Sequence, residues 1–150
     1  MSLFEQVSED IKRAMLAKDK VALDALRGIK KEFLEAKTAK GSDGELHDDQ
    51  ALHILQKLVK QRKESAEMYS QANRPELAEE EMAQCRIIEK YLPAMLDDNA
   101  LTEALTAIIA QAGATGPQDM GKVMGIATKA LAGKAEGRAI SNKVKELLNR

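Results

Sequence analysis

Apolar residues recur three or four positions apart along almost the whole chain, and no segment sustains an alternation of apolar and polar residues. A spacing of three and four places apolar side chains on one face of a helix, whereas a half-buried strand needs a period of two. The composition agrees, because Ala, Leu, Lys and Glu recur while aromatic residues make up only 3% and Trp is absent. The sequence therefore predicts an all-α fold.

Four helices are expected in the first part of the chain. The patterns indicate one helix over residues 3–17, a second after a cap at Asp19, a long third opening at Asp48, and a fourth opening at Pro75. Pro93 ends the fourth helix, because proline cannot continue the hydrogen-bond ladder. The apolar stripe expected on the first helix consists of Phe4, Val7, Ile11 and Met15.

Three shorter helical patterns follow Pro93, and glycines at positions 113 and 133 separate them. The chain is therefore expected to form two domains. Residues 1–93 would form a four-helix N-terminal domain, and residues 94–150 a small three-helix C-terminal domain.

Several classes of protein are excluded on composition. No apolar run approaches the ~18–20 residues of a membrane span, and the N-terminus lacks the pattern of a signal peptide. The single cysteine, Cys85, lies in the apolar register of the fourth helix and is expected in the core. We therefore expect a cytoplasmic protein without a membrane among its partners.

No catalytic or metal-binding pattern stands out. The GxxxxGK, GxSxG and HExxH motifs are absent, and His47 and His53 are six residues apart, so they do not share a helix face. We assign no catalytic residue, no cofactor and no metal ligand, and we expect both histidines at the surface.

The charge distribution is uneven, although the net charge of the chain is only −1. Residues 120–150 carry seven basic side chains against Glu136 and Glu146. Such a local excess suits contacts with phosphates, and the alternative is an ordinary solvated helical surface. If it binds nucleic acid, the candidate residues, which should then share one surface, are Lys122, Lys129, Lys134, Arg138 and Lys143.

Gly121 and Gly125 lie four residues apart inside a helical pattern. Each costs ~1 kcal/mol relative to alanine there, so a compensating gain is expected. Two glycines on one helix face leave a bare surface to which another backbone can come close. That backbone would belong to a neighbouring helix of the same chain, to a partner, or to a nucleic acid.

Several sequence segments together resemble the standalone YqeY proteins, and they extend over essentially the whole chain. The most specific are DMGKVMG at residues 119–125 and GKAEG at residues 133–137. The others are Arg13-Ala14-Met15, Lys18-Asp19-Lys20, Leu26-Arg27, Lys60-Gln61-Arg62-Lys63-Glu64-Ser65, Asn73-Arg74, Glu76-Leu77-Ala78 and Tyr91-Leu92-Pro93. One departure is Glu136, where the family usually has Asp, which caps a helix better than Glu does.

The resemblance implies a helical N-terminal part, a small helical C-terminal domain, and kinship with the tail domain of the B subunit of the tRNA-dependent amidotransferase (GatB). It implies a module that binds tRNA or accompanies a tRNA-handling enzyme, without a catalytic centre of its own. The alternatives are a subunit that contributes to carbon–nitrogen ligase activity on misacylated tRNA, and a protein-interaction adaptor without nucleic acid. The sequence leaves the oligomeric state open.

Overall fold

The structure is a computed structural model that describes residues 1–150. It contains seven α-helices, one short 3-10 helix and no strand, which confirms the all-α prediction. The chain divides into two compact units, unit 1 (Met1–Leu92) and unit 2 (Pro93–Arg150). Each unit has a hydrophobic core of its own.

Unit 1 contains four helices whose ends follow local sequence signals. Ser2 and Glu5 form a capping box at the start of the first helix, and the Asp19 carboxylate accepts a hydrogen bond from the Ala22 amide at the start of the second. Pro75 occupies the first turn of the fourth, where its missing N–H costs nothing. The helices are α1 (Leu3–Ala17), α2 (Lys20–Thr38), α3 (Asp48–Gln71) and α4 (Pro75–Glu89).

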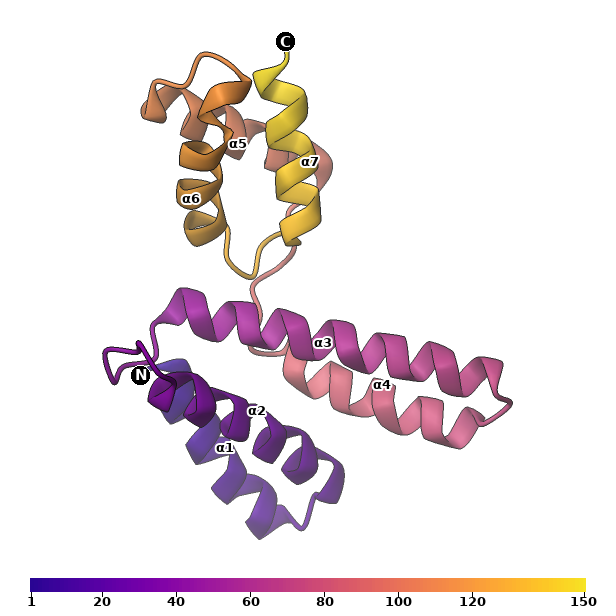
Figure 1. Ribbon diagram of the computed structural model, residues 1–150. Helices are drawn as coiled ribbons and strands as arrows, with labels where there is room; N and C mark the ends of the chain where they lie inside the picture. Colours follow the sequence, from indigo (N-terminus) through magenta and orange to yellow (C-terminus); the bar gives the residue numbers. More distant parts are fainter. The chain divides into compact units, whose positions relative to one another are not determined.

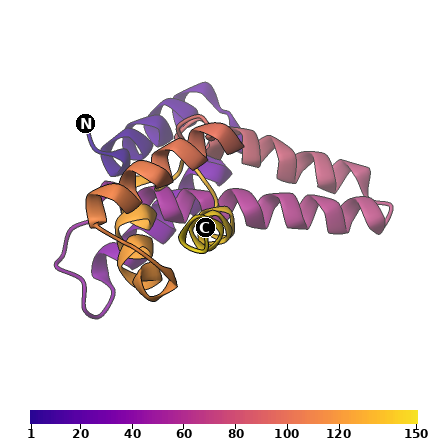
Figure 2. The ribbon, with the colours of Figure 1, turned by 90° about the horizontal axis from the view of Figure 1, so that it is seen from above.

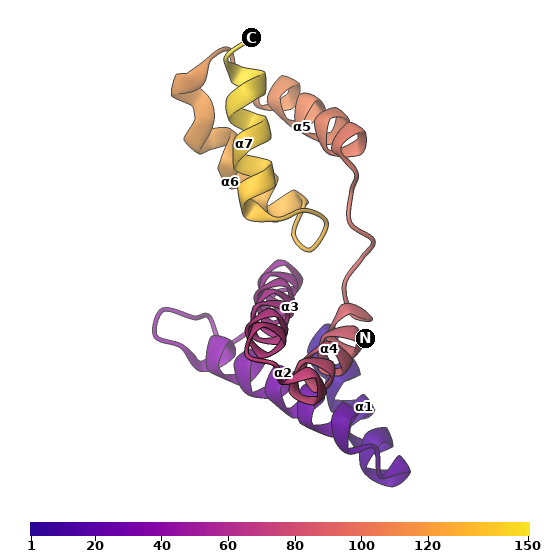
Figure 3. The ribbon, with the colours of Figure 1, turned by 90° about the vertical axis from the view of Figure 1, so that its right-hand side faces the viewer.

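The helices of unit 1 form two antiparallel hairpins. The α1–α2 hairpin lies on one side of the α3–α4 hairpin, as Figures 1 and 3 show. The core between them is built around Ile29 and Phe33 of α2, Leu55 of α3 and Ile88 of α4, all of which are almost fully buried. Cys85 is also buried in unit 1, as the apolar register of α4 predicts.

The outer half of the α3–α4 hairpin extends beyond this core. The apolar cluster around Phe33 includes no residue of α3 after Val59 and none of α4 before Ile87, and farther out only Ala66, Ala78 and Cys85 are buried. Figure 2 shows α3 and α4 running side by side to the turn that joins them. We call residues 63–82 the arm.

Unit 2 packs three helices around Leu105, Val123, Ile140 and Val144. A hydrogen bond of 2.8 Å from the Leu96 amide to the Lys134 carbonyl links the segment before its first helix to the connection before its last. The elements of unit 2 are α5 (Asp98–Ala112), the 3-10 helix η1 (Pro117–Asp119), α6 (Met120–Ala130) and α7 (Gly137–Leu148).

Candidate functional site

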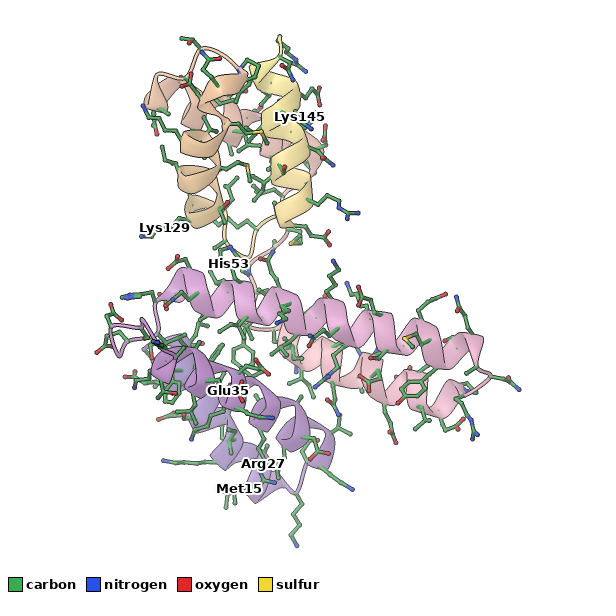
Figure 4. All side chains as sticks on the ribbon, viewed as in Figure 1. Met15, Arg27, Glu35, His53, Lys129 and Lys145 are labelled. Carbon is green, nitrogen blue, oxygen red and sulfur yellow. The ribbon has the colours of Figure 1, made fainter.

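Four of the five cations predicted to bind nucleic acid are exposed and form no ion pair. Lys122 and Lys129 lie on α6, Lys134 in the connection after it, and Arg138 in the first turn of α7. Figure 4 shows Lys129 at the end of α6. Binding of nucleic acid by these four exposed side chains stays a prediction.

Lys143, the fifth of these cations, is held inside unit 2. Its Nζ lies 3.0 Å from Oδ1 of Asp98 and 3.5 Å from Oε2 of Glu146, and its side chain is only 14% exposed. The hydrogen bond with Asp98 raises the pKa of Lys143 above its ordinary value. Because the charge of Lys143 is already compensated by two carboxylates, this residue ties α7 to α5 and is not a free cation of the surface.

Gly121 and Gly125 have no close neighbour within the chain. Both are exposed, and a Cβ atom added to either would meet no heavy atom within 4 Å. No other helix of unit 2 therefore uses the bare surface that the two glycines create. Contact with a partner at this surface stays a prediction.

The turn between α1 and α2 presents a cluster of exposed apolar side chains that the sequence analysis missed. Leu16 is 86% exposed, Met15 54% and Val21 39%. Met15 had been expected in the buried stripe of the first helix, but the helix ends beside it and no other element of unit 1 covers it. The available signal was the neighbouring pair Met15-Leu16, because two successive residues of a helix lie about 100° apart and seldom both face one core.

Several cations lie close in sequence to these apolar side chains. Residues 12–31 carry seven basic side chains against the two acidic residues Asp19 and Asp24, the same excess as in residues 120–150. Asp19 is engaged in capping α2. We call Met15, Leu16 and Val21, together with Lys12, Lys18 and Lys20, the corner.

None of the three lysines of the corner forms an ion pair within unit 1. Arg27 also lies unpaired on α2, and Figure 4 shows it with Met15 on the half of the α1–α2 hairpin that leads to the turn, whereas Glu35 lies on the other half. The corner therefore combines protruding apolar side chains with free positive charge.

A cleft of about 490 Å³ adjoins the corner, between α1, α2 and the end of α4. The Tyr91 hydroxyl donates a short hydrogen bond to Asp10 at its wall, and Arg13 lies 3.4 Å from the same carboxylate. Burial, with the Asp10 bond as a second cause, raises the pKa of Tyr91 well above its ordinary value, so the phenol stays neutral and keeps the end of α4 against α1. Lys90 also lines the cleft, which thus carries both signs of charge.

The chain presents neither a metal-binding cluster nor a membrane-spanning helix. No group of three or more His, Cys, Asp or Glu side chains is arranged to hold a metal ion. None of the seven helices combines the length and the apolar character that crossing a bilayer requires.

Comparison with known proteins gives a family and a set of relatives. A family profile described as "Yqey-like protein" matches residues 4–148. A protein of Pyrenophora tritici-repentis is 30% identical over 152 residues, covering 95% of this chain and 79% of the relative. A protein of Lachancea thermotolerans is 37% identical over 91 residues, covering 57% of this chain and 46% of the relative. A protein of Clavispora lusitaniae is 31% identical over 107 residues, covering 70% of this chain and 61% of the relative.

The names of these relatives correct two expectations. Each is called "Altered inheritance of mitochondria protein 41, mitochondrial", and none of the names mentions tRNA, an amidotransferase or a ligase. The prediction of a tRNA-binding or amidotransferase-associated module was therefore wrong. That prediction assigned the tRNA-binding role of the amidotransferase tail domain to a standalone protein. The relatives of this protein are not named as parts of an amidotransferase. The expected cytoplasmic location is overturned by the same names, because the relatives are mitochondrial proteins.

The resemblance on which these expectations rested is itself confirmed. The profile match spans nearly the whole chain and includes both of the motifs that first indicated the family. The chain belongs to the YqeY-like protein family.

Proposed function

We propose that the protein docks peripherally on membrane surfaces that carry negative charge, and that the corner is the docking site. The observation that carries this proposal is the exposure of Leu16 and Met15 at the end of α1, next to lysines that form no ion pair. An apolar protrusion flanked by cations matches the two layers of a bilayer surface, acyl chains below and charged headgroups above.

The two contributions support each other. Complete burial of a leucine side chain contributes about 1.5–3 kcal/mol, and a lysine close to an anionic lipid surface contributes about 1 kcal/mol. Either contribution alone gives a marginal, reversible contact, as for a single lipid anchor, whereas two signals together give stable association.

The names of the relatives support the same setting. Those proteins are named for the inheritance of mitochondria, which are bounded by membranes, and we propose that this chain serves in that process. No membrane partner is expected from the sequence, because no segment has the length and apolar character of a membrane span. A peripheral contact needs only a few exposed apolar side chains, and these become visible only in the folded chain.

The apolar part of the corner can be tested by sedimentation with vesicles of phosphatidylcholine containing roughly a third phosphatidylserine. We expect the double variant Met15→Ser/Leu16→Ser to bind about ten-fold more weakly than the unaltered protein, because it loses most of the apolar insertion. Met68→Ser is the matched control, since Met68 is 69% exposed but lies on the arm. Unchanged binding of the corner variant, or an equal loss in the control, would overturn the proposal.

The electrostatic part is tested by reversing charges. Lys12→Glu/Lys20→Glu is expected to reduce binding by ten-fold or more, and the binding of the unaltered protein should weaken with added salt. Lys122→Glu/Lys134→Glu changes the net charge by the same amount in unit 2 and should leave binding almost unchanged. If the unit 2 variant shows the larger loss, or if pure phosphatidylcholine vesicles bind equally well, the corner is not the docking site.

A further inference from the structure

The arm carries a groove that the proposed membrane contact does not use. The groove lies between α3 and α4 and has a volume of about 390 Å³. Its small side chains are Ala66, Ser70 and Ala78, and Met82 adds an apolar wall. Small residues along the seam between two helices let a third element come close to both backbones.

The packing of the arm is incomplete compared with the rest of unit 1. Near the cluster around Phe33, α3 and α4 are covered by the α1–α2 hairpin, but that cluster contains no residue of the arm. Within the arm, the buried residues are the small side chains Ala66 and Ala78. A pair of helices buries one stripe of each helix, so a further helix in the groove would complete a three-helix arrangement.

The charge of the arm selects the partner. Residues 63–82 contain six glutamates and only two basic residues, Lys63 and Arg74. Two of the glutamates are paired, Glu81 with Arg62 at 3.7 Å and Glu79 with Arg86 at 2.5 Å. The four that form no ion pair are Glu64, Glu67, Glu76 and Glu80.

The glutamates without ion pairs flank the groove on both sides. Glu67 lines the groove from α3, and Glu64 precedes it by three residues on the same face of that helix. Glu76 precedes the groove residue Glu79 by three residues on α4. Lys63 is the one cation that lines the groove, and Glu79 is neutralised by Arg86, so the free negative charge at the groove is that of Glu67 with Glu64 and Glu76 beside it.

We infer that the groove of the arm binds an amphipathic helix of another protein, whose apolar side chains fill the groove and whose lysines and arginines face the glutamates. This is the helix-in-groove mode of recognition, in which anchors three and four residues apart provide affinity and flanking charges provide orientation. The inference is independent of the proposed membrane contact, because the arm and the corner share no residue.

The test uses the full-length protein and a fluorescein-labelled peptide of sequence LKKLLKLLKKLLKL, in solution without lipid. Fluorescence anisotropy should show saturable binding of this peptide and none of its counterpart with Glu in place of Lys. Ser70→Trp fills the groove from an exposed position and should weaken binding at least ten-fold. Asn142→Trp, at an exposed position of α7, is the matched control for the added indole and should bind normally.

A second pair of variants separates the groove from general attraction of a basic peptide. Glu67→Lys/Glu76→Lys should weaken binding at least ten-fold, whereas Glu35→Lys/Glu45→Lys, with the same change of net charge outside the arm, should leave it within two-fold. Equal losses in the two charge variants, or normal binding by Ser70→Trp, would overturn the inference. So would a peptide-independent increase in size with protein concentration that Ser70→Trp abolishes, because the groove would then hold a second copy of the chain.

Discussion

At the scale of the residue, burial makes Cys85 a poor nucleophile. Its Sγ is enclosed within unit 1 and lies 3.1 Å from Oε1 of Glu89. Burial, followed by the hydrogen bond and the negative charge of Glu89, raises the pKa of the thiol from 9.0 to about 11. The thiolate is the reactive form of cysteine, so the fold suppresses the reactivity of the only thiol in the chain.

This shift predicts the behaviour of Cys85 toward iodoacetamide. At pH 8 the folded protein should react about 100-fold more slowly than the urea-unfolded chain, because a pKa higher by about two units lowers the thiolate fraction by that factor. The rate is measured by mass spectrometry of the alkylated protein, and Cys85→Ser is the blank. Equal rates in the folded and unfolded states would show that the thiol is accessible.

The same group makes stability depend on pH at the alkaline side. The folded pKa of Cys85 lies above the unfolded value. The contribution of the neutral, buried thiol to the free energy of unfolding is therefore fully present below about pH 9 and is lost as the pH rises toward 11. Cys85→Ala should therefore show a smaller fall in the free energy of unfolding between pH 9 and pH 11, measured by urea denaturation.

At the scale of the element, the start of α7 keeps a weak cap. Glu136 occupies the N-cap position with an extended backbone, φ −73° and ψ 146°, but its side chain makes no capping hydrogen bond. A glutamate is one methylene longer than the aspartate that the family resemblance leads one to expect, and it ranks below Asp, Asn and Ser at this position. The sequence alone identified this departure, and the structure shows the unused cap.

Restoring the shorter side chain should therefore stabilise unit 2. We expect Glu136→Asp to raise its free energy of unfolding by about 0.5–1 kcal/mol, since the carboxylate can then accept from an amide of the first turn. Urea denaturation followed by circular dichroism measures the change. Glu136→Gln is the control and should gain nothing, because it keeps the length of the present side chain.

At the scale of the whole molecule, the chain carries two separate hydrophobic cores. Every residue of the first core belongs to Met1–Leu92, and every residue of the second belongs to Pro93–Arg150. A segment that contains a complete core can fold by itself, although the core of a chain shorter than ~70–80 residues supplies little stability.

Expression of the two segments separately tests this division. The fragment of residues 1–92 should be helical and unfold cooperatively, and the fragment of residues 93–150 should be helical but melt at a lower temperature. Circular dichroism at several temperatures measures both. A fragment 1–92 that lacks cooperative unfolding would show that its core depends on the rest of the chain.

The sequence predicted the helices well because their signals are local. Apolar spacing, the cap at Asp19 and the proline at position 75 each act within a few residues, and helices begin beside both of these residues. The prediction that Pro93 ends the fourth helix was less accurate, because α4 already ends at Glu89. The candidate site was harder to predict. Lys143 looked like any other lysine of residues 120–150, and only the approach of α5 brings Asp98 to it from 45 positions away.

What the sequence by itself determined is which residues are helical, which face of each helix is apolar, and to which family the chain belongs. What only the tertiary structure decided is which of those faces is covered. Met15 continues the stripe of Val7 and Ile11 but lies beyond the covering helices, so it is exposed, and the glycines of α6 meet no neighbour at all. The physical reason is that periodicity follows from the geometry of one helix, whereas burial depends on contacts between segments far apart in the chain.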